Sequence, residues 1–256
     1  MIAEPTMLLV HSPLLTRATW GALRPHLEAA GWRVAEPDLR PLVEAPSFHA
    51  AVCTAAVASV APGAPTVVVG HSRAGPYLPG ITDAVGSDRL DVVFLDARLP
   101  HPGTSWVGSL PPERATWLRE MAVSGRLPTW DTWFPASSID DLLPDPDQRR
   151  KVLHGLPELP WKVVSEVLPA PGEAWNSARH GGQGARRPAE GQVAQPDPHE
   201  RVEGGAVYLQ LSAAYQSTAE QAEECGYRVR RRDADHLAMV TQPAMVTDLL
   251  LSALRA

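Results

Sequence analysis

The stretch that decides the fold is Thr66-Val67-Val68-Val69-Gly70-His71-Ser72-Arg73-Ala74-Gly75. Its β-branched residues predict a buried strand, and the residues after Ser72 can begin a helix. Gly70 and Ala74 lie two positions before and after Ser72, and both are small enough for a strand and a helix to pass closely. This context is typical of a nucleophile elbow, a strained turn at which helix N–H groups can stabilise an oxyanion. An ordinary strand-to-helix turn capped by Ser72 would show the same pattern.

Composition sets limits on the class of protein. A chain of 256 residues with 44% hydrophobic residues can form one large α/β domain or two small ones. Its net charge of −6 argues against nucleic acid and anionic membrane surfaces as partners. Residues 1–5 lack a basic leader, and no apolar run is long enough to span a membrane. Cys53 and Cys225 lack the spacing of metal ligands, so we expect a cytoplasmic protein with reduced thiols. The sequence as a whole implies neither a metal nor an organic cofactor.

Strands and helices alternate through the first hundred residues. We expect strands at 7–10, 32–35, 66–69 and 92–95, and helices at 20–31, 48–60 and 74–85. This order predicts a parallel sheet with helices on both faces. Active sites in such sheets lie at the carboxyl ends of the strands, where Ser72 and Asp96 are both expected.

The regular alternation stops at Pro100. We interpret residues 100–205 as a cap inserted between two sheet strands of a single domain that spans residues 1–256. Within the cap, residues 176–205 have almost no large apolar side chain and are expected to form a flexible loop. Strands at 206–211 and 227–231 and helices at 217–225 and 243–254 complete the expected fold. The cap holds six of the eight tryptophans, at positions Trp106, Trp117, Trp130, Trp133, Trp161 and Trp175.

Four local motifs carry a resemblance to a known family. They are Val10-His11-Ser12-Pro13, the run of spaced residues from Trp20 to Leu39, Leu95-Asp96-Ala97-Arg98-Leu99-Pro100, and Asp235-His236-Leu237 followed by Pro243. In their order and spacing they resemble the α/β-hydrolase superfamily, most of all the hydroxynitrile lyase and methylesterase branch with its bacterial esterase relatives. The resemblance covers about three-fifths of the chain and leaves the cap outside.

Ser72 and His236 are the candidate nucleophile and base. A serine hydroxyl needs a base within hydrogen-bond reach, and His236 lies between the last expected strand and the last helix, where a loop can bring it over Ser72. The resemblance usually places the third member, an Asp, after the strand that follows the cap, yet residues 212–215 contain no carboxylate. Asp96 is the nearest substitute. The adjacent Asp235, the cap residues Glu166 and Glu173, and a Ser–His dyad without an acid are weaker alternatives.

The oxyanion loop also departs from the family. The backbone N–H of Arg73 is one expected donor, but the position of the second is Pro13, which has no N–H. The hydroxyl of Ser12 is the candidate replacement, and the resemblance assigns His11 to shaping the loop. Hydroxynitrile lyases carry a lysine directly after the histidine, where this chain has Leu237, which argues against cyanide chemistry.

Two further groups are candidates for substrate binding. The side chain of Arg73 could bind a substrate carboxylate, or it could pair with Asp96 or with an acid of the cap. Trp130 and Trp133 could line an aromatic pocket, although cap tryptophans can equally form the cap's own small core.

We therefore expect an α/β-hydrolase that cleaves a small, largely apolar ester or thioester, aromatic ones included, through an acyl-Ser72 intermediate. Two alternatives stay open. One is a lyase or cyclase on the same scaffold that acts on a natural-product-like intermediate. The other is a non-catalytic protein that binds a small molecule. The expected partner is a small-molecule substrate, and a homodimer is left open.

Overall fold

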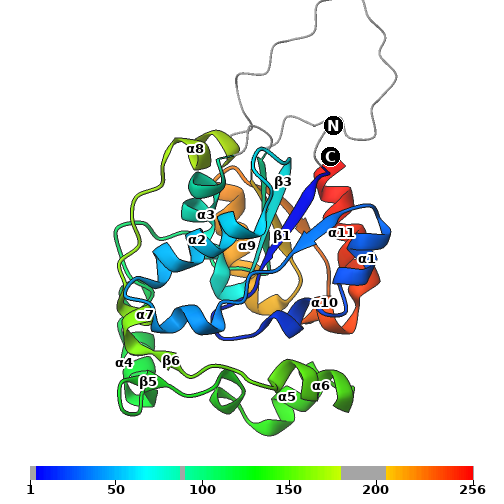
Figure 1. Ribbon diagram of the computed structural model, residues 1–256. Helices are drawn as coiled ribbons and strands as arrows, with labels where there is room; N and C mark the ends of the chain where they lie inside the picture. Colours follow the sequence, from blue (N-terminus) through cyan, green and yellow to red (C-terminus); the bar gives the residue numbers. More distant parts are fainter. Residues whose placement is uncertain (1–3, 87–89, 180–205, 256) are drawn as a thin grey trace, which may run out of the picture.

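The computed structural model describes residues 4–86, 90–179 and 206–255. Six parallel strands form its main sheet in the order β2-β1-β3-β4-β7-β8 (Figure 1). The predicted parallel sheet is confirmed, and each expected strand is present within two residues of its predicted ends. The strands are β1 (Thr6–Val10), β2 (Arg33–Ala35), β3 (Thr66–His71), β4 (Leu90–Leu95), β7 (Val207–Gln210) and β8 (Arg228–Arg231).

Alternate residues of the buried strands face two separate layers of helices, as the two-residue period of a strand requires. Leu8 and Val10 of β1 belong to one apolar cluster, with α2 (Phe48–Ser59), α3 (Leu78–Val85), α8 (Glu173–Arg179) and α9 (Gln216–Glu224). Met7 and Leu9 belong to the other cluster, with α1 (Arg24–Ala29), α10 (Ala238–Thr241) and α11 (Pro243–Arg255). The sheet is therefore buried on both faces, and its carboxyl-terminal edge is left for a site.

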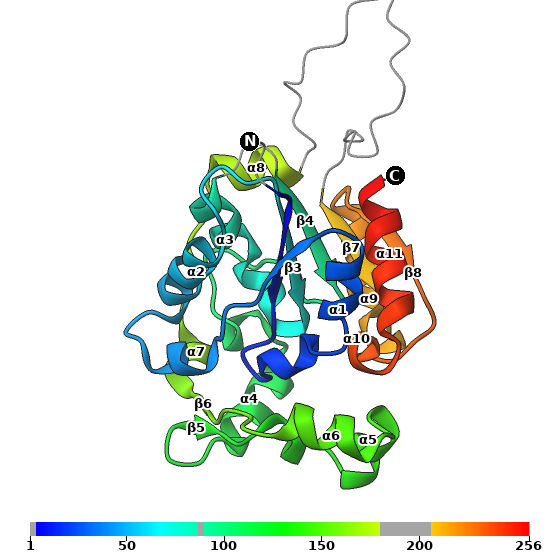
Figure 2. The ribbon, with the colours of Figure 1, turned by 45° about the vertical axis from the view of Figure 1, so that its right-hand side comes forward.

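Part of the segment that follows β4 lies across that edge. Figures 1 and 2 show α4, β5, β6, α5 and α6 beneath the ends of the strands. A role of this segment as a cap stays a prediction. Its elements are η4 (Val107–Ser109), α4 (Pro112–Met121), β5 (Arg126–Leu127), η5 (Trp130–Trp133), α5 (Ala136–Leu142), α6 (Pro146–Leu153), β6 (Leu159–Pro160) and α7 (Trp161–Ser165).

Two expected helices are shorter than their sequence pattern indicates. Of the expected helix at 20–31, Trp20 instead ends a 3₁₀ helix, η1 (Arg17–Trp20), and the α-helix is limited to α1, which has Pro25 in its first turn. After Ser72 the chain forms a 3₁₀ helix, η3 (Ser72–Tyr77), and α3 begins only at Leu78. Pro76 explains the delay, because it has no N–H to donate to the carbonyl of Ser72. That carbonyl instead accepts the N–H of Arg98 at 3.0 Å.

The prediction of a flexible loop at 176–205 is wrong for its first four residues. Residues 176–179 belong to α8, which packs against the sheet through the buried Trp175. Asp83 of α3 accepts the backbone N–H of Trp175 at 2.9 Å and fixes this helix in place. Residues 180–205 lie outside the described residues. Within the described part of the chain, no helix combines the length and apolar character that crossing a bilayer requires.

Candidate active site

Ser72 stands at a strained turn between β3 and η3. Its φ of +57° lies in the left-handed region, which a non-glycine residue seldom occupies. A Cβ atom at Gly70 would approach the side chain of Leu78 to 2.7 Å, so the predicted need for a small residue there holds. The tightest approach is one residue beyond the predicted Ala74, because a Cβ atom at Gly75 would lie 1.9 Å from the carbonyl oxygen of Arg98. The turn therefore has the geometry predicted for a nucleophile elbow, and the role of Ser72 as the nucleophile stays a prediction.

A chain of hydrogen bonds joins the three predicted catalytic residues. The hydroxyl of Ser72 lies 3.1 Å from Nε2 of His236, and Nδ1 of His236 lies 2.6 Å from a carboxylate oxygen of Asp96. The residues come from the end of β3, the loop after β8 and the end of β4. The predicted contact between Asp96 and His236 is therefore observed, and the geometry is that of a Ser–His–Asp triad.

The carboxylate of Asp96 is fully buried and saturated with donors. Besides His236, it accepts the N–H of Leu211 at 2.9 Å, the N–H of Ser212 at 3.1 Å and the hydroxyl of Ser212 at 2.6 Å. Burial alone would raise the pKa of Asp96, but the hydrogen bonds from His236 and Ser212 outweigh it and leave the pKa below its usual value. Asp96 is thus an anion at neutral pH.

His71 contacts His236 through its ring and through a hydrogen bond. The rings of the two histidines lie 4.5 Å apart, and Nε2 of His71 lies 2.9 Å from the carbonyl oxygen of His236. Burial, helped by the proximity of His236, lowers the pKa of His71 well below its usual value. His71 is therefore neutral, and its Nε2–H donates to the carbonyl oxygen of His236 and so helps to hold the loop that carries this residue.

The other carboxylates considered for the triad have different partners. Asp235 accepts the N–H of Leu237 and the hydroxyl of Thr241, which fixes the turn into α10. Glu166 accepts the hydroxyl of Ser47 and the N–H of His49 at the start of α2. Glu173 lies in the first turn of α8.

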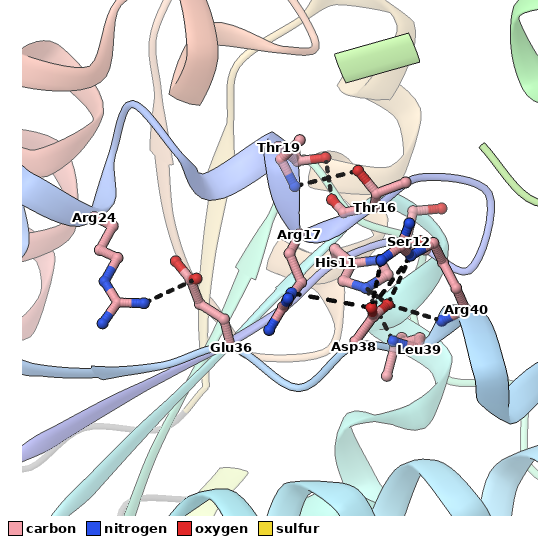
Figure 3. A network of polar contacts seen from close by, with 11 residues as sticks. His11, Ser12, Thr16, Arg17, Thr19, Arg24, Glu36, Asp38, Leu39 and Arg40 are labelled. Carbon is pink, nitrogen blue, oxygen red and sulfur yellow. Dashed lines mark hydrogen bonds and ion pairs between the residues drawn. The ribbon is translucent and has the colours of Figure 1, made fainter. Parts of the chain in front are cut away.

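His11 is held by two hydrogen bonds in the loop after β1, where the resemblance places the oxyanion loop. Its Nδ1–H donates to the carbonyl of Ser12 at 2.7 Å, and its Nε2 accepts the N–H of Leu39 at 3.1 Å (Figure 3). Burial lowers the pKa of His11 to about 4, so the ring is neutral. The buried hydroxyl of Ser12 accepts the N–H of Leu14 at 3.2 Å. Its role as an oxyanion donor stays a prediction.

Tyr215 is the site residue that sequence reasoning missed. Its hydroxyl lies 3.2 Å from that of Ser72, and its ring stacks on His236 with centroids 4.9 Å apart and an interplanar angle of 7°. Tyr215 ends η6 (Ala213–Tyr215), directly after β7. The family resemblance led us to expect a carboxylate in residues 212–215. The polar group that this segment supplies to the site is instead the phenol of Tyr215.

A pocket of about 520 Å³ is lined by Arg73, the residue that follows Ser72, while Ser72, His236 and Asp96 are not among its described lining residues. Trp133 lines it as predicted. Trp130 does not, and instead packs edge-on against Phe134. Trp106 and Trp117 take the place predicted for Trp130.

The predicted pairing of Arg73 with Asp96 or a cap acid is not observed among the described residues. Its guanidinium lies over the ring of Trp106, 4.2 Å from the centroid.

No protein-family model matches the chain, and no curated protein matches it in sequence. Solved structures do match. An extracellular α/β-hydrolase from a Paenibacillus species is 19% identical, with a TM-score of 0.67 over 98% of this chain and 99% of the other. Tomato methylketone synthase I is 15% identical, with a TM-score of 0.64 over 98% of both chains. A pyrethroid hydrolase from Sphingobium faniae is 17% identical, with a TM-score of 0.58 over 98% of both chains.

These likenesses cover almost the whole chain at low sequence identity. The chain has the α/β-hydrolase fold.

Proposed function

We propose that this chain is a serine hydrolase that cleaves a small carboxylic ester or thioester through an acyl-Ser72 intermediate. The observation that carries the proposal is the continuous hydrogen-bond chain from Ser72 through His236 to Asp96. The neighbours add support, since they include an α/β-hydrolase, a pyrethroid hydrolase and a methylesterase from Arabidopsis.

In the first step His236 takes the proton of Ser72 at Nε2 as the hydroxyl oxygen attacks the carbonyl carbon. Asp96 fixes the tautomer with a proton on Nδ1 and stabilises the imidazolium that forms. Because this carboxylate is buried and ionised, its effect is not weakened by water. His236 then protonates the leaving alcohol or thiol, and in the second half-reaction it activates water to release the acid.

The oxyanion of each tetrahedral intermediate needs at least two donors. The N–H of Arg73, the residue after the nucleophile, is one of them. Pro13 has no N–H, so the hydroxyl of Ser12 is proposed as the second. The hydroxyl of Tyr215, 3.2 Å from the oxygen of Ser72, is close enough to donate to the reacting centre as well.

A lyase is the second candidate, and two observations favour it. Pro13 removes a donor that acyl transfer relies on. Tyr215 places a second acid–base group beside Ser72. Such an enzyme would use Ser72 and Tyr215 to move protons and would form no acyl-enzyme. A neighbour that is named a synthase, tomato methylketone synthase I, was solved with 2-tridecanone bound.

A fluorophosphonate probe separates these candidates. The unmodified protein should be labelled at one residue and should hydrolyse 4-nitrophenyl butyrate. Ser72→Ala should abolish both, whereas Ser165→Ala, which removes an exposed serine of α7, should change neither. A folded protein that reacts with neither the probe nor the ester would overturn the proposal and favour the lyase or a non-catalytic binding protein. The cytoplasmic location, the small-molecule partner and the homodimer stay predictions.

A further inference from the structure

The pocket of about 520 Å³ is positively charged. Three arginines line it, Arg73, Arg98 and Arg114, and no aspartate or glutamate is among its described lining residues. Arg73 and Arg98 lie at the end near the triad, since Arg73 follows Ser72 and the guanidinium of Arg98 lies 4.9 Å from the ring centroid of Tyr215. Arg114 is exposed and lies over Trp117. The positive charge thus extends from the reacting serine outward.

The guanidinium of Arg73 has no counter-ion among the described residues. The groups whose charge acts on its pKa are Tyr215, Arg98 and Tyr77. Glu166 lines a small cavity together with Arg73, but it forms no ion pair with Arg73 and instead accepts the hydroxyl of Ser47 and the N–H of His49. Burial, opposed only in part by Tyr215, lowers the pKa of Arg73 to about 10, so the group remains charged at neutral pH. Arg73 is only partly exposed, and a partly desolvated cation without a carboxylate partner is costly. The face of Trp106 offsets part of that cost.

Two side chains that line the pocket have unused donors. Nε of Arg98 and Nε1 of Trp106 are buried, and among the described residues they have no hydrogen-bond partner. Buried donors are nearly always paired in folded proteins. The wall of the pocket therefore carries unpaired donors, and none of its described lining residues is an acidic acceptor.

We infer that this pocket binds a carboxylate that the substrate carries in addition to its ester group. An ionised carboxylate only accepts hydrogen bonds, and it matches the planar fork of a guanidinium. Trp106, Trp117 and Trp133 supply an apolar wall for the part of the molecule between its two ends. The inference rests on the proposed function and narrows it: the substrate is an acidic ester, not the largely apolar one that the sequence indicated.

A binding measurement tests the pocket without relying on turnover. Phenylacetate and its neutral isostere phenylacetamide are titrated into the Ser72→Ala protein, and tryptophan fluorescence reports binding. Phenylacetate should bind at least tenfold more tightly than the amide and should weaken as salt is added. Adding Arg98→Gln should remove most of that preference. Arg119→Gln, a matched exposed arginine on the same helix as Arg114 but outside the pocket, should keep it.

A kinetic measurement tests the same preference in the unmodified enzyme. Mono-4-nitrophenyl glutarate and 4-nitrophenyl pentanoate are close in size and differ in one carboxylate on the acyl side. A second pair, 4-acetoxybenzoate and phenyl acetate, places the carboxylate on the leaving group. In at least one pair kcat/KM should be about tenfold higher for the charged ester, and Arg98→Gln should lower that ratio. Because the two esters of a pair are compared within one variant, a general loss of activity lowers both kcat/KM values and leaves their ratio unchanged.

The two measurements have separate outcomes. Selective binding of phenylacetate without hydrolysis of any ester would support the pocket and contradict the proposed function. Hydrolysis with no charge preference in either pair, and equal binding of acid and amide, would overturn the pocket and leave the hydrolase intact. Tight binding that Arg98→Gln does not change would also overturn it, because the carboxylate would then lie in the product position at Ser72.

Discussion

The carboxylate of Asp96 binds the segment after β7 as well as His236. It accepts two N–H groups and one hydroxyl from Leu211 and Ser212, and it holds a φ of +44° to do so. The resemblance places the acid in that segment. Here the acid stands at the end of the neighbouring strand and reaches the same histidine, while the segment supplies the donors that keep it ionised.

Replacing Asp96 should therefore affect catalysis far more than a purely structural residue would. In Asp96→Asn the amide would favour the wrong tautomer of His236, and kcat for 4-nitrophenyl butyrate should fall about a thousandfold or more. Circular dichroism should show that the variant remains folded. A loss under about fivefold would assign Asp96 to structure alone.

Ser12 should matter because Pro13 cannot donate. Ser12→Ala should lower kcat by about a hundredfold, the usual effect of removing one oxyanion donor. Pro13→Gly, which restores an N–H, should recover part of that loss in the double variant. If Ser12→Ala has the turnover of the unmodified enzyme, the oxyanion is held by Arg73 and some other group.

Tyr215 should contribute through its hydroxyl rather than its ring. Tyr215→Phe keeps the stacking on His236 but removes the group 3.2 Å from Ser72, so kcat should fall by roughly tenfold to a hundredfold with little change in KM. Tyr227→Phe, in the apolar core, is the matched control and should retain full activity. Equal activity of the two variants would show that Tyr215 only packs.

At the scale of elements, the turn from β3 through η3 to α3 depends on Gly75. A Cβ atom there would collide with the backbone of Arg98, which cannot move without displacing β4. We expect Gly75→Ala to lower the free energy of unfolding by about 1–3 kcal/mol or more, the range for overpacked sites. Gly21→Ala, where the nearest atom is 3.3 Å away, should cost far less. Thermal unfolding measures both, and similar melting temperatures would contradict the account.

Sequence reasoning succeeds for the elements that local sequence patterns determine. Strand β3 and the serine after it were predictable, because β-branched runs and small residues act locally. Asp96 and His236 could be named because motif order places them at strand ends on one edge of the sheet.

Other features depend on packing between distant parts of the chain. The ring of Tyr215 can stack on His236 only after β7 and β8 have paired. Likewise, Trp106 rather than Trp130 lines the pocket because of how the inserted segment folds. The 3₁₀ form of η3 was foreseeable from Pro76, which the helix prediction overlooked.

For the whole molecule, four partly or fully buried histidines make folding sensitive to acid. Burial lowers the pKa of His11, His49, His71 and His101. Below pH 6.5 the unfolded chain binds protons that the folded chain does not, so stability is highest above that pH and falls toward pH 4.

The contribution of His11 to this loss of stability in acid is large enough to measure. Its folded pKa of about 4 implies a loss of about 1 kcal/mol between pH 7 and pH 5.5 from this residue alone. In His11→Gln the decrease in the free energy of unfolding over that interval should be smaller by the same amount. Urea unfolding followed by tryptophan fluorescence measures it, and an equal decrease in both proteins would show that His11 is charged in the folded state.

The central claim is that Ser72 carries the acyl group, and intact-mass spectrometry tests it most directly. The enzyme is mixed with 4-nitrophenyl acetate and quenched in acid within the first turnover. We predict a protein heavier by one acetyl group, with the modification on the peptide that contains Ser72 and absent from Ser72→Ala. Ester hydrolysis with no adduct on Ser72 at any time, or an adduct that persists in Ser72→Ala, would contradict the account.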